Sequence, residues 1–178
     1  LALGFKDFVS PDAPDIYPEE LRADIDALNV IIYADFNLAV NLAALVTNQK
    51  DYEYYYDRIF ARLDWLEERL SKQRYLMGDT ITDSDIRIFP TLARFDLVFY
   101  QKYLVNKKRL VDYPNLWNYA KDLYSNPAFG GTTDFDSMRK RFYYVDHTPF
   151  EDLPRLVPKG PDDSIWLEPN NRAEKFGK

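Results

Sequence analysis

The stretch Tyr-Leu-Met-Gly-Asp-Thr-Ile-Thr-Asp-Ser-Asp-Ile, residues 75–86, decides how the middle of this chain folds. A turn containing Gly78 leads to Thr82, and threonine often begins helices because its side chain accepts a hydrogen bond from a backbone N–H. Asp85 follows three residues later, where its carboxylate can accept a hydrogen bond from the N–H of Thr82. This pattern is a capping box with aspartate in place of glutamate. It predicts that a helix begins after Thr82 with about 1 kcal/mol of stabilisation from its cap.

The helix predicted after Thr82 has apolar residues on almost every side. They are Ile86, Ile88, Phe89, Leu92, Phe95 and Val98. A helix that is apolar all round is typical of the centre of a bundle. Pro90 should kink it, because proline lacks the N–H that a helix interior uses. Asp96 lies inside it beside Arg94, and we expect a buried ion pair there, with a structural role favoured over a functional one.

Two long amphipathic helices are predicted before this segment. Pro18 suits the first position of a helix, and the acidic Glu19 and Glu20 suit its positive end. Apolar residues recur at helical spacing up to about residue 47, and a second stripe covers residues 52–70. Two helices joined by so few residues should pack antiparallel.

The remaining third of the chain predicts shorter helices and an irregular tail. Pro114 begins a helix that stops before Pro127, and a short helix is expected over residues 134–143. After residue 144 the chain is too rich in proline for regular structure, yet we expect it to wrap across the helices, because its apolar residues would be costly to leave in water. These are Phe150, Leu153, Leu156, Val157 and Trp166. No stretch alternates convincingly enough to predict a strand, so the fold class is an all-α helical bundle.

Composition argues against several classes of function. The 178 residues carry a net charge of −6, whereas nucleic-acid binders gather Lys and Arg on one face. With no cysteine and a single histidine, His147, these residues offer no disulfide, no cysteine nucleophile and no metal site. There is no Gly-rich phosphate loop. We find no signal peptide and no apolar run that reaches the length of a membrane span, and we expect a cytoplasmic protein.

Several strings of residues resemble one superfamily. Residues 75–86 look like the capping region of the glutathione transferase C-terminal domain, and residues 113–116 followed by 126–129 resemble later parts of that domain. A narrower likeness connects residues 85–96, Asp-Ile-Arg-Ile-Phe-Pro-Thr-Leu-Ala-Arg-Phe-Asp, to a signature of the xi-class transferases, the glutathionyl-hydroquinone reductases. Further stretches that resemble this class are 15–22, 112–116, 143–144 and 156–161.

The resemblance implies a parent protein with two domains. In this family a thioredoxin-like domain supplies a cysteine and most contacts to glutathione, and the C-terminal helices supply the hydroquinone pocket and a dimer interface. The family reaction removes glutathione from a glutathionyl-hydroquinone with a second glutathione and releases the disulfide. On this basis residues 1–17 are interpreted as a remnant of the thioredoxin-like domain and a linker. Residues 18–144 would be the helical domain, and residues 145–178 a tail packed on it.

The candidate substrate-binding residues are mostly tyrosines. The resemblance assigns Tyr143 or Tyr144 to the pocket, with Tyr144 preferred, and Tyr103 near the end of the central helix is a third candidate. A tyrosine hydroxyl can bind a phenolic substrate, although packing in the aromatic core is the competing interpretation. Asn41 and Phe99 stand where the family usually has tyrosine. Asn41 can still form hydrogen bonds, whereas Phe99 has lost the hydroxyl.

Two hypotheses of different class follow. The first is the acceptor-pocket and dimerisation domain of a glutathione-dependent reductase that acts on aromatic or phenolic adducts, with its cysteine upstream of Leu1. The second is a non-catalytic helical interaction module that kept the fold and lost the chemistry. Its apolar face, normally covered by the thioredoxin-like domain, would then be exposed or used in a homodimer.

Overall fold

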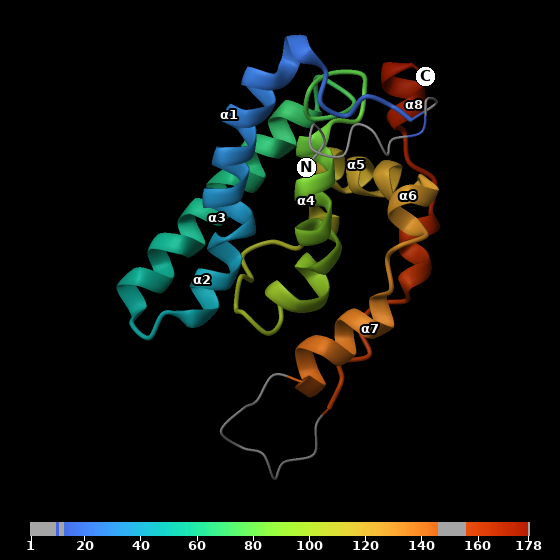
Figure 1. Ribbon diagram of the computed structural model, residues 1–178. Helices are drawn as coiled ribbons and strands as arrows, with labels where there is room; N and C mark the ends of the chain where they lie inside the picture. Colours follow the sequence, from blue (N-terminus) through green and yellow to red (C-terminus); the bar gives the residue numbers. More distant parts are fainter. Residues whose placement is uncertain (1–9, 11–12, 146–155, 178) are drawn as a thin grey trace.

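The computed structural model describes residues 10, 13–145 and 156–177, the side chains of residues 144 and 145 excepted. This part of the chain is helical and contains no strand beyond a single bridge between Tyr75 and Gly78. The prediction of an all-α fold is therefore confirmed. In Figure 1, the central helix α4 stands between the long segments α1, α2 and α3 on one side and α5, α6 and the C-terminal tail on the other.

The first predicted helix is a helical segment whose pitch changes in the middle. After a short 3-10 turn (Glu19–Leu21), α1 spans Arg22–Ile32 and α2 spans Ala39–Leu45. Between them Tyr33–Asn37 form a π-helical turn. Such a turn adds a residue to the helical register and rotates the apolar stripe that follows. The extent of the helix matches the prediction to within a few residues, but a 3.6-residue periodicity does not reveal the π turn.

The second long helix, α3 (Gln49–Leu70), turns back along the first segment, as predicted. Asn48 begins it, because its side-chain oxygen accepts from the backbone N–H of Asp51 at 3.0 Å. The two predicted stripes form one core. Its buried members are Ile25, Leu28, Ile32, Phe36, Ala39, Val40, Ala43, Ile59, Phe60, Leu63, Leu66 and Leu70. Each large member contributes about 1.5–3 kcal/mol on burial, so packing rather than helix propensity stabilises this hairpin.

The central helix α4 (Asp83–Arg94) begins at the predicted capping box, which is present. The buried Asp85 carboxylate accepts from the N–H of Thr82 at 2.8 Å and from its hydroxyl at 3.0 Å. It also accepts from the N–H of Leu76 at 3.0 Å and the hydroxyl of Tyr119 at 2.7 Å. Desolvation by burial raises the pKa of Asp85. The cap therefore also connects α4 to the preceding turn and to a distant helix, which the local pattern did not indicate.

The expected ion pair between Asp96 and Arg94 is wrong. Asp96 lies in a second π-helical turn (Phe95–Phe99) that follows α4. Its carboxylate accepts from the backbone N–H groups of Leu110 (2.6 Å) and Val111 (3.3 Å). Arg94 instead donates to the carbonyl of Pro90 at 2.6 Å. The π turn changes the direction in which the side chains point, so neighbours in sequence do not meet.

The next helix, α5 (Pro114–Ser125), begins at the predicted proline and is preceded by a 3-10 turn (Leu110–Asp112). Its first free N–H groups are satisfied from α3, because the Glu67 carboxylate accepts from Asn115 at 2.9 Å and from Leu116 at 2.8 Å. A negative side chain is favourable at a helix N-terminus. The short helices that follow are α6 (Pro127–Gly130), α7 (Phe135–Lys140) and a π turn (Arg141–Val145).

The described part of the tail returns along the bundle and ends at α8 (Arg172–Phe176), beside α5 (Figure 1). Trp166, in a 3-10 turn (Asp163–Leu167), is buried as predicted. Leu156 is not buried, since 82% of its surface is exposed. Predictions from the sequence for four further places lie outside the described residues: Leu1 to Phe8, His147, Phe150 and Leu153.

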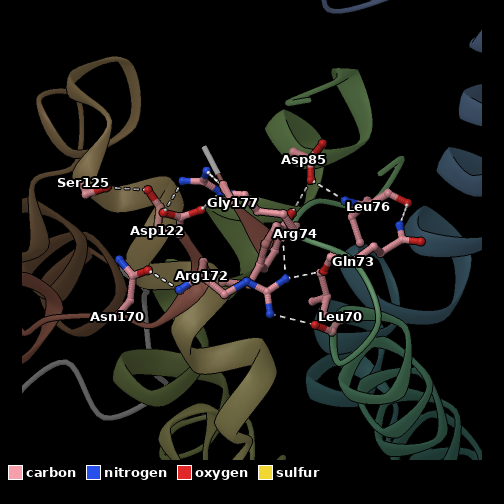
Figure 2. A network of polar contacts seen from close by, with 11 residues as sticks. Leu70, Gln73, Arg74, Leu76, Asp85, Asp122, Ser125, Asn170, Arg172 and Gly177 are labelled. Atoms are coloured by element: carbon pink, nitrogen blue, oxygen red, sulfur yellow. Dashed lines mark hydrogen bonds and ion pairs between the residues drawn. The ribbon is translucent and has the colours of Figure 1, made fainter. Parts of the chain in front are cut away.

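Arg172 anchors the end of the tail. Its side chain is fully buried, and its guanidinium donates to backbone carbonyls at the end of α3 and in the turn beyond it (Figure 2). Nearby, Arg74 donates to the Asp122 carboxylate at 2.9 and 3.1 Å and to the carbonyl of Gly177 at 3.0 Å. The tail is therefore connected to the ends of both α3 and α5.

One expectation about hydropathy needs correction. The helical segment Glu19–Leu45 is long and apolar enough to cross a membrane by length and composition alone. The core helix of a soluble protein passes the same test, and this helix buries Ile25, Leu28 and Phe36 against the rest of the bundle. Its outer face also carries apolar residues: Val30 is 68% exposed and Tyr33 is 59% exposed.

Candidate functional site

A cavity of about 570 Å³ lies where the turn from α2 into α3 faces the loop that follows the second π turn. We call it the α2–α3 cavity. One side consists of residues between Ala43 and Gln49, and the other of Lys102, Tyr103, Leu104 and Asn106, with Tyr52 from α3 between them. The size is within the range of small-molecule sites, about 300–1,000 Å³.

The loop on this side of the cavity is held in an unusual conformation. Leu104 has a φ of 59°, in the left-handed region that non-glycine residues rarely adopt. The Tyr52 hydroxyl donates to the carbonyl of Leu104 at 2.7 Å and so fixes this turn. Strained backbone of this kind is concentrated at functional sites, because it persists only where surrounding contacts maintain it.

Lys102 is the one charged side chain among the described residues that line the α2–α3 cavity. Its ammonium group donates to the backbone carbonyl of Phe142 and lies 5.5 Å from the ring centroid of Tyr143. Both contacts hold the amine near aromatic rings, where a cation is stabilised by the electrons of the ring faces. The cavity therefore combines mostly uncharged walls with one positive charge, an arrangement suited to an aromatic ligand that carries a partial negative charge.

Three aromatic residues form a cluster next to the cavity. Phe99 lies 5.5 Å from Tyr103 and 6.4 Å from Phe142 between ring centroids, and Tyr103 lies 6.3 Å from Phe142. The Tyr143 hydroxyl donates to the carbonyl of Leu97 at 3.0 Å. Desolvation by burial raises the pKa of Tyr143, and the nearby Tyr103 raises it further. Tyr143 thus stays a neutral phenol at physiological pH.

The structure brings some of the predicted site residues together and separates others. Phe99, Tyr103 and Tyr143 gather near Lys102, but of these three only Tyr103 lines the cavity. Phe99 is buried inside the aromatic cluster, and Tyr143 lies behind Lys102. Asn41 does not line it either, because its amide donates to the carbonyl of Asn37 at 2.9 Å, one turn earlier. The Tyr144 side chain lies outside the described part.

Three residues at the cavity were missed from the sequence. Tyr52 belongs to the apolar stripe of α3 and was interpreted as core. Lys102 and Leu104 lie in a loop with no periodic signal, so no local pattern indicated them. Among the described residues there is no group of three His, Cys, Asp or Glu side chains that could hold a metal ion.

Comparison with known proteins agrees with the helical architecture. Residues 49–122 match the family described as glutathione S-transferase, C-terminal domain. The chain carries a glutathione S-transferase C-terminal domain. A glutathione transferase from Gordonia bronchialis is 43% identical with a TM-score of 0.90, and the match covers 98% of this chain and 54% of that one.

The relatives of this glutathione transferase domain include glutathionyl-hydroquinone reductases and xi-class transferases. Glutathionyl-hydroquinone reductase PcpF of Sphingobium chlorophenolicum is 38% identical over 83% of this chain and 46% of its own length. The glutathione-bound structure of YqjG, a glutathione transferase homolog from Escherichia coli K-12, is 33% identical with a TM-score of 0.86 and covers 97% of this chain and 55% of that one. The chain thus spans about half the length of the relatives it matches.

Proposed function

We propose that this chain provides the acceptor pocket of a glutathione-dependent reductase that acts on glutathionyl-hydroquinone-type adducts. The observation that carries the proposal is the α2–α3 cavity, which Lys102 and Tyr103 line from the same side. A cation favours the oxygen of a phenol, most of all when it develops negative charge, and an aromatic wall favours its ring. The kinship with glutathionyl-hydroquinone reductases supports this substrate class.

The chemistry of such a reaction needs groups that these 178 residues do not contain. No cysteine occurs among them, so the thiolate and the main glutathione site belong, in this proposal, to a thioredoxin-like half like that of the family. The thiolate attacks the sulfur of the adduct, the carbon–sulfur bond breaks, and the ring carbon takes a proton. A second glutathione then releases glutathione disulfide from the cysteine. The part of this chain is to bind and orient the phenol.

The domain division predicted from the sequence is part of the same proposal: residues 1–17 precede the helical domain, residues 18–144 form it, and residues 145–178 pack on it as a tail. We also propose a cytoplasmic homodimer. The apolar outer face of the first helical segment supports a partner surface, because Val30, Tyr33 and Leu45 are 68%, 59% and 73% exposed. A partner that covers these residues would remove apolar surface from water, which favours association.

The same face favours a second candidate function, a non-catalytic helical interaction module. The two candidates differ in what the full-length protein does with glutathione. Turnover of a glutathionyl-hydroquinone by the full-length protein supports the reductase, whereas its absence, together with a stable homodimer in sedimentation experiments, supports the module. The 178 residues alone should show no turnover in either case, because they contain no cysteine.

Variants of the full-length protein test the pocket itself. Lys102→Met should raise KM for the adduct by about tenfold, because a charge-assisted hydrogen bond contributes roughly 1.5 kcal/mol or more. Lys107→Met is the matched control, since this exposed lysine lies in the same loop but does not line the cavity. If KM is unchanged in Lys102→Met, or changes equally in both variants, the cavity is not the acceptor pocket.

A further inference from the structure

A second cavity, of about 380 Å³, lies between the C-terminal tail and the body of the bundle. We call it the tail cavity. Among the described residues, none lines both this cavity and the α2–α3 cavity. Its walls come from four separate places in the chain: the second π turn with the residues after it, the turn before α5, α5 itself, and the tail. The tail therefore covers the helices and also forms one wall of a cavity large enough for a small molecule.

The inner end of the tail cavity is apolar and aromatic. A small enclosed void continues it and shares the apolar residues Val111, Trp117, Pro161 and Ile165 with it, together with Asp96. Beneath them Trp166 packs edge-on against Trp117, with ring centroids 4.7 Å apart and the rings inclined by 74°. Trp117, supported from behind by Trp166, and the branched side chains of Val111 and Ile165 form walls suited to a flat hydrocarbon group.

The charged residues that line the tail cavity carry a net negative charge. The Asp96 carboxylate is fixed by the N–H groups of Leu110 and Val111. The charge of Arg109 is already countered, because its guanidinium pairs with Asp112 at 3.0 Å. Glu168, on the tail side, makes no hydrogen bond or ion pair with another described residue. Arg109 also acts on Asp96 at longer range, but it forms its ion pair with Asp112, so Asp96 and Glu168 have no salt bridge within the described part of the chain and give the cavity a net negative charge.

Two polar groups near these carboxylates can form further hydrogen bonds. Tyr100 and Trp117 line the cavity, and neither the Tyr100 hydroxyl nor the Trp117 indole N–H forms a hydrogen bond within the described part of the chain. Their ring faces can also stabilise a cation at close range. A protonated amine would thus meet carboxylates for its charge, a hydroxyl for its hydrogen bonds and aromatic faces for its methylene groups.

We propose that the tail cavity binds a small aryl-alkyl amine, with its ring against Trp117 and its ammonium group between Asp96 and Glu168. This site is separate from the acceptor pocket and does not depend on the reductase function. It needs no group outside the 178 residues, so it can be tested on this chain and on the full-length protein alike.

The test uses three ligands with the same phenylethyl group and end groups of different charge: 2-phenylethylamine, 2-phenylethanol and 3-phenylpropionate. The intrinsic fluorescence of Trp117 and Trp166 reports binding, in a Trp65→Phe background that removes the third tryptophan. We expect saturable binding of the amine, at least about tenfold tighter than the alcohol, because hydrogen bonds to charged groups contribute roughly 1.5–3 kcal/mol. The carboxylate should bind most weakly. Equal binding of all three, tighter binding of the carboxylate, or no saturable response to the amine overturns the proposal.

Two variants locate the site. Glu168→Gln should weaken binding of the amine by about tenfold and leave the alcohol unchanged, since it removes charge and preserves shape. Glu174→Gln is the matched control, because this exposed glutamate does not line the cavity, and it should change neither ligand. Val111→Trp should fill the hollow and abolish binding of both. An undiminished amine affinity in Glu168→Gln rejects the assignment even if Val111→Trp does not fold.

Discussion

Replacing Arg172 with methionine tests how the C-terminal tail is held to the helices. The buried guanidinium donates to the carbonyl oxygens of Leu70 at 2.7 Å and Arg74 at 2.6 Å, and also to that of Gln73 (Figure 2). These acceptors lie at and just beyond the C-terminal end of α3, where carbonyls lack helical partners and a positive charge is favourable. Methionine has a similar length but no donor, so three carbonyls lose their hydrogen bonds.

The expected loss is the difference between two large contributions. Three hydrogen bonds from a charged donor contribute roughly 5–9 kcal/mol. Against this, burying a charge costs several kcal/mol. The structure shows that cost: burial lowers the pKa of Arg172, and its Nε atom has no hydrogen-bond partner among the described residues. We expect a net decrease of about 3 kcal/mol in the free energy of unfolding, or roughly 6–12 °C in Tm for a chain of this size.

Thermal and urea unfolding, followed by far-UV circular dichroism, measure this loss. Lys175→Met is the control, because Lys175 is an exposed basic residue on the same short helix and should change the free energy of unfolding by less than about 0.5 kcal/mol. Hydrogen exchange should also become faster at the end of α3 in Arg172→Met. If Arg172→Met unfolds within about 0.5 kcal/mol of the wild type, the guanidinium does not hold the tail and the reasoning is refuted.

Three further predictions concern single contacts. Glu67→Gln should lower the free energy of unfolding by about 1 kcal/mol, measured by urea unfolding, because it removes the negative charge that caps α5; no change would contradict the cap. Tyr52→Phe should cost about 1 kcal/mol in the same assay, and less in a Leu104→Gly background, because glycine adopts the positive φ without support; an equal loss in both backgrounds would remove Tyr52 from the role of fixing the loop. Burial raises the pKa of Tyr75 to about 12 from 10.0, so the folded state favours the neutral phenol and the stability from this group is present below pH 10 and lost as the pH rises towards 12. Tyr75→Phe should therefore lose stability less steeply than the wild type in urea titrations across that pH range, and parallel curves would show that Tyr75 does not contribute.

Helix boundaries were the most predictable part of the fold. The cap at Thr82 and Asp85 and the proline at Pro114 act within a few residues of their own position, so their effect can be read from the chain directly. The apolar stripes of α1 and α3 were predictable for the same reason, since a helix brings residues three and four apart onto one face. The π turns were not, because the apolar spacing of an ordinary helix carries no sign of the extra residue in each.

The candidate site was predictable only in part. Tyr103 and Tyr143 were named from residue type and resemblance, and the structure brings both close to Lys102. Lys102 itself was missed, because a lysine in a loop is usually solvent-exposed. Only the tertiary structure shows that the turn between α2 and α3 lies across the cavity from it. Asp96 shows the same limit: its partners are backbone groups 14 and 15 residues away, whereas the neighbouring Arg94 turns elsewhere.

The sequence by itself determined that the chain is helical, where most helices begin and end, which faces are buried, and that no cysteine chemistry occurs within these residues. These features follow from spacing and residue type, which act locally. Only the tertiary structure decided the two cavities and the anchoring of the tail. Arg172 reaches carbonyls about 100 residues away, and the tail cavity has walls from four separate segments. Such contacts depend on how helices pack in three dimensions. Because they join residues far apart in the sequence, no periodic pattern of residues predicts them.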